Sequence, residues 1–243
     1  MGMRSKWQHC TKAWIYAFTT ENTRSSMKKP NFTWLQVAVH LGGWFPLAAL
    51  FYDFLTDNLT ANPIQAIEQR TGYTALVFLT LSLACTPLAF LGWKEMAQRR
   101  KALGVYGFLY AALHVVVFVA VDYGLNLNAI LRDVGTKQYI LLGTAAFLLL
   151  VPLAVTSFNY WMKRLGRNWK RLHRLVYLIV PLVILHFFLA RKGNLLTLSG
   201  DIVQPLIFSS LVVLLLLLRL GIVKRGLVRV RTRLLSARTP TAG

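Results

Sequence analysis

Four of the five histidines of this chain lie within or at the edge of long apolar segments: His40, His114, His173 and His186. A side chain that can ionise costs on the order of a few kcal/mol at membrane depth, so it usually serves a function there. Neutral imidazole is a common metal ligand. The four residues are therefore candidate ligands of a metal buried between helices.

His173 and His186 share one apolar segment, residues 169–188. Their separation in sequence corresponds to roughly 20 Å along an α-helix, which places one imidazole near each face of a membrane. Two metal-binding groups stacked in this way indicate a path for electrons across the bilayer. At 3.6 residues per turn the two rings do not share one face, although Pro181 between them can kink the helix.

His114 is the predicted partner of His186. Counted from Leu103, His114 lies about 16 Å into its segment, and His186 lies roughly 20 Å into its own segment counted from Leu172. The two segments run in the same direction, so the imidazoles can face each other at similar depth. Two neutral imidazoles from neighbouring helices suit the axial positions of a haem b. We therefore predict His114 and His186 as axial ligands of a haem iron.

The inner end of the path is less complete, because a second haem at the depth of His173 needs a second ligand there. Lys101 and Arg100 stand thirteen and fourteen residues before His114, so that segment supplies no histidine at this depth. His40, about 10 Å into the first apolar segment, is the remaining candidate. We predict His173 as a third ligand and His40 as its only available partner, for one haem b or two.

Other uses of the histidines fit less well. Zinc needs further Cys, His or carboxylate ligands, and no acidic residue lies deep in an apolar segment. Covalent haem attachment needs Cys-x-x-Cys-His, whereas the two cysteines, Cys10 and Cys85, are far apart. Interhelical hydrogen bonding by individual histidines remains an alternative.

The composition defines the class of protein. The chain has 243 residues, a net charge of +20 and a hydrophobic fraction of 56%, with a mean hydropathy of +0.50. A soluble protein with this charge would suggest nucleic-acid binding. Here the apolar residues form blocks of about the 20 residues that span a bilayer, so an integral membrane protein without a nucleic-acid partner is expected. The six blocks are residues 33–54, 73–93, 103–121, 139–158, 172–190 and 204–220.

We therefore predict an all-α bundle of six transmembrane helices over residues 31–221. Basic residues concentrate before the first block, between the second and third, between the fourth and fifth, and after the sixth, which predicts that both termini are cytoplasmic. Loops 56–72 and 122–138 are then periplasmic. Residues 1–30 are expected to be a leader without function, with translation starting at Met27, or else a segment that lies on the membrane surface. Residues 222–243 are expected to be a basic cytoplasmic tail.

Several motifs, in this order and spacing, resemble the MsrQ family (formerly YedZ) of the ferric-reductase-like transmembrane superfamily. They are WLQVAVH at 34–40, NPI at 62–64, TGYTAL at 71–76, RRKALG at 99–104, LAVTS at 153–157 and GRNWKRLHRLVY at 166–177. The resemblance covers about residues 30–225. It implies that His114, His173 and His186 match the haem histidines of the family. The wider superfamily has two histidines on each of two helices, and this chain departs from it on the third block.

The resemblance implies a subunit of the bacterial inner membrane that binds haem b and FMN. It would draw electrons from the quinone pool, or from a cytoplasmic flavin reductase, and pass them to a periplasmic molybdopterin-containing catalytic subunit that repairs oxidised methionines. Basic residues at the inner surface, among them Arg100 and Arg171, could pair with haem propionates or a flavin phosphate.

The catalytic sulfoxide-reducing site itself is not expected in this chain. A built-in NADPH-binding domain is not expected, given the length and the lack of a G-x-G-x-x-G loop in this sequence. Two alternatives remain open: a stand-alone ferric or quinone reductase of the transmembrane cytochrome b type, and a non-redox membrane module. A Soret band in the purified protein would favour the haem-containing redox functions, and its absence would favour the non-redox membrane module.

Overall fold

The computed structural model describes residues 33–191 and 203–220, together with residues 223, 225, 226 and 229. The predicted leader and most of the predicted tail lie outside these residues. By its contacts the chain divides into two units, between Ala38 and Val39. The fold below is that of residues 39 onward.

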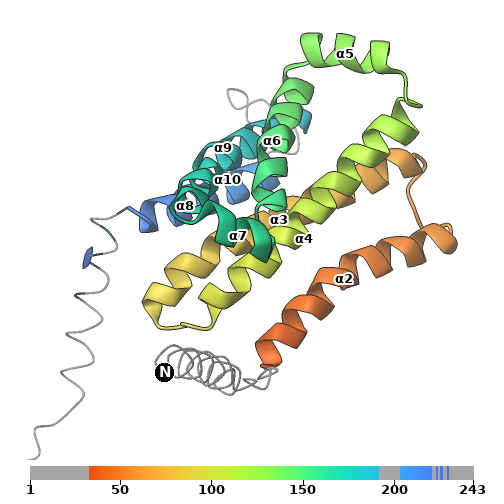
Figure 1. Ribbon diagram of the computed structural model, residues 1–243. Coiled ribbons are helices and arrows are strands. Elements are labelled where there is room, and N and C mark those ends of the chain that lie inside the picture. Colours follow the sequence, from red (N-terminus) through yellow and green to blue (C-terminus); the bar gives the residue numbers. More distant parts are fainter. Residues whose placement is uncertain (1–32, 192–202, 221–222, 224, 227–228, 230–243) are drawn as a thin grey trace, which may run out of the picture. The chain divides into compact units, whose positions relative to one another are not determined.

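The described part is helical throughout, without strands (Figure 1). Its longer helices are α2 (Trp34–Leu55), α3 (Pro63–Leu91), α4 (Met96–Val116), α6 (Gln138–Val155), α9 (Val176–Ala190) and α10 (Val203–Leu218). The shorter elements are the π-helix η1 (Val117–Asp122), α5 (Leu127–Thr136), α7 (Asn159–Leu165), α8 (Arg167–Leu172) and the 3₁₀ turn η2 (His173–Leu175). The predicted all-α class is confirmed.

Five helical stretches are long and apolar enough to cross a membrane: Trp34–Leu55, Pro63–Leu91, Met96–Asp122, Gln138–Val155 and Arg167–Ala190. They correspond to the first five predicted blocks. The sixth block contains α10, which is apolar but has only 16 residues. Side chains such as Leu148 and Leu131 are 64% and 69% exposed, and apolar exposure on this scale is typical of a surface that faces lipid or a partner.

Two predicted loops are partly helical. Residues 63–72 were expected in the loop before the second block, but α3 begins at Pro63. The side chain of Asn62 accepts a hydrogen bond from the Gln65 amide, and proline suits the first helical position. In the same way Asn126 caps α5 through the Ala129 amide, within the predicted loop 122–138. Both helix starts are polar, so a search for apolar blocks does not find them.

Close packing between helices builds the core. Helix α3 runs beside α4, and α6 beside α9, as Figure 1 shows. A Cβ atom added to Gly107 of α4 would come within 2.9 Å of the Leu79 side chain of α3. In a bilayer the lipid is as apolar as the core, so helix association depends on such close contacts of small residues. Ile179 of α9 is fully buried against Leu150 and Leu153 of α6.

Candidate functional site

His114 and His186 come together between the helices. His114 lies near the end of α4 and His186 near the end of α9. Their ring centroids are 6.3 Å apart, and the ring planes are inclined by 69°. The structure therefore brings these two of the four predicted site residues to one place.

Each of these rings is oriented by a backbone carbonyl of a neighbouring helix. His114 Nδ1 lies 3.0 Å from the carbonyl oxygen of Glu68 on α3, and His186 Nδ1 lies 2.7 Å from that of Tyr139 on α6. A carbonyl only accepts, so Nδ1 carries the proton and donates it in both cases. The lone pair of each ring is then on Nε2. This is the usual arrangement of metal-binding histidines, in which the second nitrogen is held by an outer hydrogen bond.

Two glycines make room for the rings. A Cβ atom on Gly143 of α6 would lie 2.7 Å from His186 Nδ1, and one on Gly72 of α3 would lie 3.3 Å from His114 Nδ1. Each imidazole thus rests against helix backbone. The sequence prediction did not include these glycines. The available signal was a small residue inside an apolar segment, which is common at membrane helix contacts but does not indicate which side chain it faces.

The His114–His186 pair fits the axial ligands of one haem. A metal-to-imidazole bond is about 2 Å long, so the centres of two rings bound on opposite sides of one metal are about 6 Å apart. The observed separation of 6.3 Å agrees with that arrangement. Both Nε2 atoms are left for the metal by the hydrogen bonds at Nδ1. The residues present therefore fit the haem that the resemblance implies.

The helix that carries His114 changes form directly after it. Residues 117–122 make the π-helix η1, which was not predicted. Single π-turns within α-helices occur frequently at functional sites, because the extra residue rotates the side chains around it. Here η1 connects the histidine segment to the polar residues that precede α5.

His173 lies apart from this pair. It begins the 3₁₀ turn η2, and its Nδ1 is 3.1 Å from the carbonyl oxygen of Trp169, one turn earlier on the same segment. Its ring lies against that of Trp169, with centroids 4.0 Å apart and planes inclined by 33°. Trp169 is itself held by a 2.8 Å hydrogen bond from its indole nitrogen to the Thr156 carbonyl.

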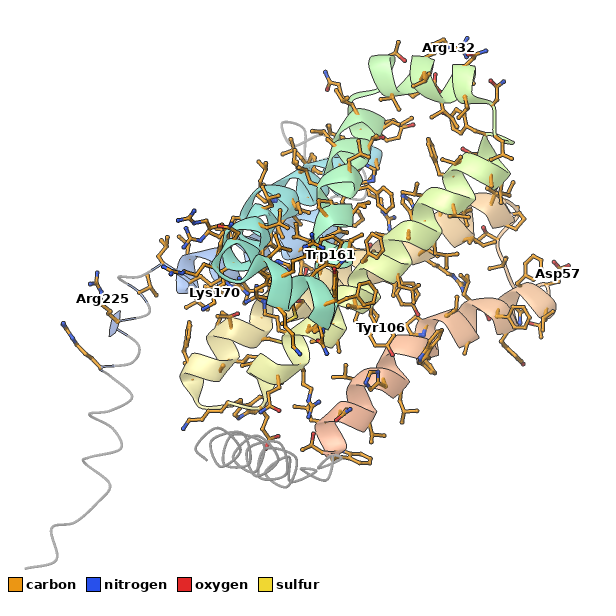
Figure 2. The ribbon with its side chains drawn as sticks, viewed as in Figure 1. Asp57, Tyr106, Arg132, Trp161, Lys170 and Arg225 are labelled. Carbon is orange, nitrogen blue, oxygen red and sulfur yellow. The ribbon has the colours of Figure 1, made fainter. Side chains whose placement is uncertain are left out.

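His40 contacts a tyrosine. Its Nδ1 lies 2.9 Å from the hydroxyl of Tyr106 on α4, and the rings meet edge to face at 5.9 Å. Tyr106 is labelled in Figure 2, on the part of α4 beside α2. In the described part of the chain, the only contact between two histidine rings is that of His114 with His186. The structure thus does not bring His40 and His173 together as it does the other two.

Comparison with known proteins identifies relatives that match about three quarters of this chain. Residues 71–184 match the family model described as "Ferric reductase like transmembrane component". The chain is 41% identical over 192 residues to the protein-methionine-sulfoxide reductase heme-binding subunit MsrQ of Herminiimonas arsenicoxydans, covering 78% of this chain and 86% of that protein. It is 40% identical to the MsrQ proteins of Deinococcus radiodurans and Rhodospirillum rubrum, over 76% of this chain and 90% and 86% of theirs.

Identity at this level over most of the length of the relatives confirms the resemblance that the motifs indicate. The transmembrane family model and the long apolar helices agree on a multi-pass membrane protein. The predicted location in the inner membrane is confirmed, because MsrQ proteins are inner-membrane subunits. The chain belongs to the MsrQ family of the ferric-reductase-like membrane proteins.

Proposed function

We propose that this chain is a haem b-binding electron-transfer subunit of a methionine sulfoxide reductase system. It would pass electrons across the bacterial inner membrane to a periplasmic, molybdopterin-containing catalytic subunit. The observation that carries the proposal is the His114–His186 pair, with both Nδ1 atoms held by carbonyls and both Nε2 atoms available. The names of the relatives, which are haem-binding subunits of protein-methionine-sulfoxide reductase, support it.

In this proposal His114 and His186 would hold the haem, and the carbonyls of Glu68 and Tyr139 keep both imidazoles in the tautomer that can bind a metal. A bound haem supplies a one-electron carrier, whose potential depends on the axial ligands and the polarity of the pocket. His173 is a further ligand candidate, at the end of the path where electrons enter. His40 is the fourth candidate, although its Nδ1 hydrogen bond is to Tyr106.

The direction of transfer follows from the position of the pair. Tyr139 is the second residue of α6 and directly follows the segment of α5, and Glu68 lies in the second turn of α3. The pair therefore lies near the membrane face that carries α5. We propose that this face is periplasmic and meets the catalytic subunit. The opposite face carries the basic residues Lys163, Arg164, Arg167, Lys170 and Arg171 of α7 and α8, as the positive-inside rule requires of a cytoplasmic face.

This topology needs an even number of spans. With five long apolar stretches and α10 as the sixth, both termini would be cytoplasmic. A slightly short span is accommodated by local thinning of the bilayer or by flanking residues that reach the interface. Electrons would enter at the basic face from quinol or from a cytoplasmic flavin reductase, with FMN as a second cofactor.

The test is the haem content of histidine variants. Purified wild-type protein should show a Soret band, and a pyridine haemochrome assay should give the haem per polypeptide. His114→Ala and His186→Ala should each lose most of the haem, while His40→Ala should have a smaller effect. Near-complete retention of haem in both of the first two variants would refute the ligand assignment, and wild-type protein without a Soret band would refute the electron-transfer function.

A further inference from the structure

Helix α5 is held at the level where two membrane-crossing stretches end. The stretch Met96–Asp122 finishes just before it, and Gln138–Val155 begins just after it. The Leu125 amide donates to the Val119 carbonyl of η1 at 2.9 Å, and only Lys137 separates α5 from α6. Because one residue spans at most about 3.6 Å, both ends of α5 stay close to this level. Figure 1 shows α5 turned across the direction of α4 and α6.

Helix α5 carries three rows of side chains, and the members of each row share a face because they are four residues apart. The rows are Leu127 with Leu131, Ile130 with Val134, and Asn128 with Arg132. The second row is half-buried on the side of the protein, and the other two rows are exposed. Leu127 and Leu131 are 66% and 69% exposed. An apolar row and a polar row, exposed side by side, require different surroundings.

Leu125, just before α5, is both strained and exposed. Its φ is 63°, in the left-handed region that leucine rarely adopts, and the described part of the chain leaves its side chain 66% exposed. The preceding Gly124, with a φ of 55°, adopts this region at little cost. Strain of this kind persists only where the surroundings stabilise the residue in another way. Contact of the leucine side chain with an apolar medium would supply that stabilisation, whereas contact with water would not.

The exposed leucines continue an apolar surface of the two adjoining membrane-crossing stretches. Val121, at the end of one stretch, and Leu141, at the start of the other, are 53% and 50% exposed. Apolar side chains exposed there face lipid. Tyr123 stands between Val121 and α5, and Tyr139 between α5 and Leu141. Because tyrosine is enriched where a membrane meets water, this arrangement favours lipid, rather than a water-soluble protein, as the medium around the leucines of α5.

We propose that α5 lies in the plane of the membrane surface, with Leu125, Leu127 and Leu131 inserted among the lipid acyl chains and Asn128 and Arg132 facing water. An amphipathic helix at this level buries its apolar face at the boundary between headgroups and acyl chains. The inference holds for either side of the membrane and with or without haem, so it does not rest on the proposed function. In that function, the polar row is the part of α5 left for the catalytic subunit.

The test is spin labelling of single cysteines on α5 in the full-length protein, reconstituted into phosphatidylcholine and phosphatidylglycerol vesicles. The variants are Leu127→Cys and Leu131→Cys, with Asn128→Cys and Arg132→Cys as matched controls on the neighbouring face of the same helix. Electron paramagnetic resonance measures how often each label collides with oxygen, which concentrates in the bilayer, and with a water-soluble nickel chelate.

The background carries Cys10→Ser, and Cys85 is fully buried and should not react with the label. Leu148→Cys provides the reference for a lipid-facing position, because Leu148 is 64% exposed on the membrane-crossing helix α6. Circular dichroism and size exclusion check the fold of each variant.

We expect the labels at positions 127 and 131 to collide with oxygen nearly as often as the label at 148, and with nickel several times less often than the labels at 128 and 132. If nickel reaches all four positions of α5 equally, the leucines face water and the proposal is wrong. If neither reagent reaches 127 and 131, protein covers them and the proposal is also wrong.

The reaction rates of the unlabelled cysteines with a water-soluble maleimide decide where a bulky label perturbs a variant. Cysteines at 127 and 131 should react slowly, and those at 128 and 132 rapidly. Equal rates at all four positions would contradict the proposal. None of these results depends on the haem content or on the compartment that α5 faces, so a failure of the proposed function would leave them unchanged.

Discussion

The rings of the two paired histidines are oriented by backbone carbonyl oxygens, which no side-chain substitution removes. His114 and His186 are each oriented by one backbone carbonyl, from Glu68 and Tyr139 respectively. Outer hydrogen bonds of this kind hold the ring of a metal ligand in position and set its tautomer. The space that allows them comes from glycines on the helices that carry the carbonyls. At the scale of the residue, the site is therefore perturbed most selectively through those glycines.

Gly143→Ala should lower haem content without removing a ligand. The new Cβ would lie 2.7 Å from His186 Nδ1, so the ring must move away from the Tyr139 carbonyl. Loss of an outer hydrogen bond of a metal ligand typically reduces metal affinity by roughly 10–100-fold. The measurement is the haem-to-protein ratio after dilution, together with the position of the Soret band.

Gly42→Ala is the control for that substitution. Gly42 is also in a helix that can cross the membrane, but a Cβ there would meet nothing within 4 Å. Its haem content should equal that of the wild type, and its helix should be slightly favoured. Equal haem retention in Gly143→Ala and Gly42→Ala would contradict the role given to Gly143.

At the scale of the element, α3 and α4 form the tightest helix pair, and one glycine allows it. A Cβ on Gly107 would lie 2.9 Å from the Leu79 side chain and 3.2 Å from the Leu79 amide nitrogen. Backbone cannot move aside as a flexible side chain can. Gly107→Ala should therefore destabilise the fold by about 1–3 kcal/mol, the usual cost of overpacking. Thermal unfolding in detergent measures the loss, and an unchanged midpoint relative to Gly42→Ala would contradict this packing.

Helix α5 is fastened by a small polar cluster outside the membrane spans. Asp133 accepts hydrogen bonds from Lys137 at 2.6 Å and from the Tyr123 hydroxyl at 2.5 Å. The bonds from Lys137 and Tyr123 hold the pKa of Asp133 below its ordinary value. The same contacts raise the pKa of Lys137 and of Tyr123. The cluster joins the segment before α5 to the start of α6.

Acid should therefore loosen α5. The folded-state pKa of Asp133 is depressed, so its stabilisation is complete above the unfolded-state pKa of about 4 and is lost as pH falls through the lower folded-state value. The protection of residues 125–136 against hydrogen exchange, corrected for the intrinsic exchange rate at each pH, should fall below about pH 4 in the wild type. In Asp133→Asn, this protection should already be lower at neutral pH and should change little with acid. If Asp133→Asn loses protection in acid as much as the wild type does, a group other than Asp133 is responsible for the pH dependence.

At the scale of the whole molecule, the proposed function requires that α5 and α8 face opposite compartments. Arg132 lies on α5 and Lys170 on α8, as Figure 2 shows, and both side chains are exposed. Single cysteines at these positions, in a background without Cys10, should react with a membrane-impermeant maleimide on different sides. Cys85 is fully buried and should stay unlabelled.

Arg132→Cys should label in intact spheroplasts, and Lys170→Cys only after lysis. The reason is the charge distribution, since basic residues resist translocation across the inner membrane. Labelling of both cysteines from one side would rule out the proposed path for electrons, while the reverse pattern would invert its direction.

Much of this architecture could be predicted from the sequence. Apolar blocks of spanning length indicate membrane helices without further context, because the bilayer sets their length. The depths of His114 and His186 follow from the rise per residue, and the order of motifs pointed to the family that the relatives confirm. The first turns of α3 and all of α5 were missed, because their asparagine caps and polar starts carry no signal in hydropathy.

The sequence by itself determined the class of protein and five of its apolar stretches of membrane-spanning length, because these depend only on composition. The depth of each histidine stays a prediction from the helical rise. The tertiary structure decided which rings meet and what orients them. The acceptors for His114 and His186 lie 46 and 47 residues away, on other helices, and which face of a helix meets them depends on close packing that hydropathy does not encode.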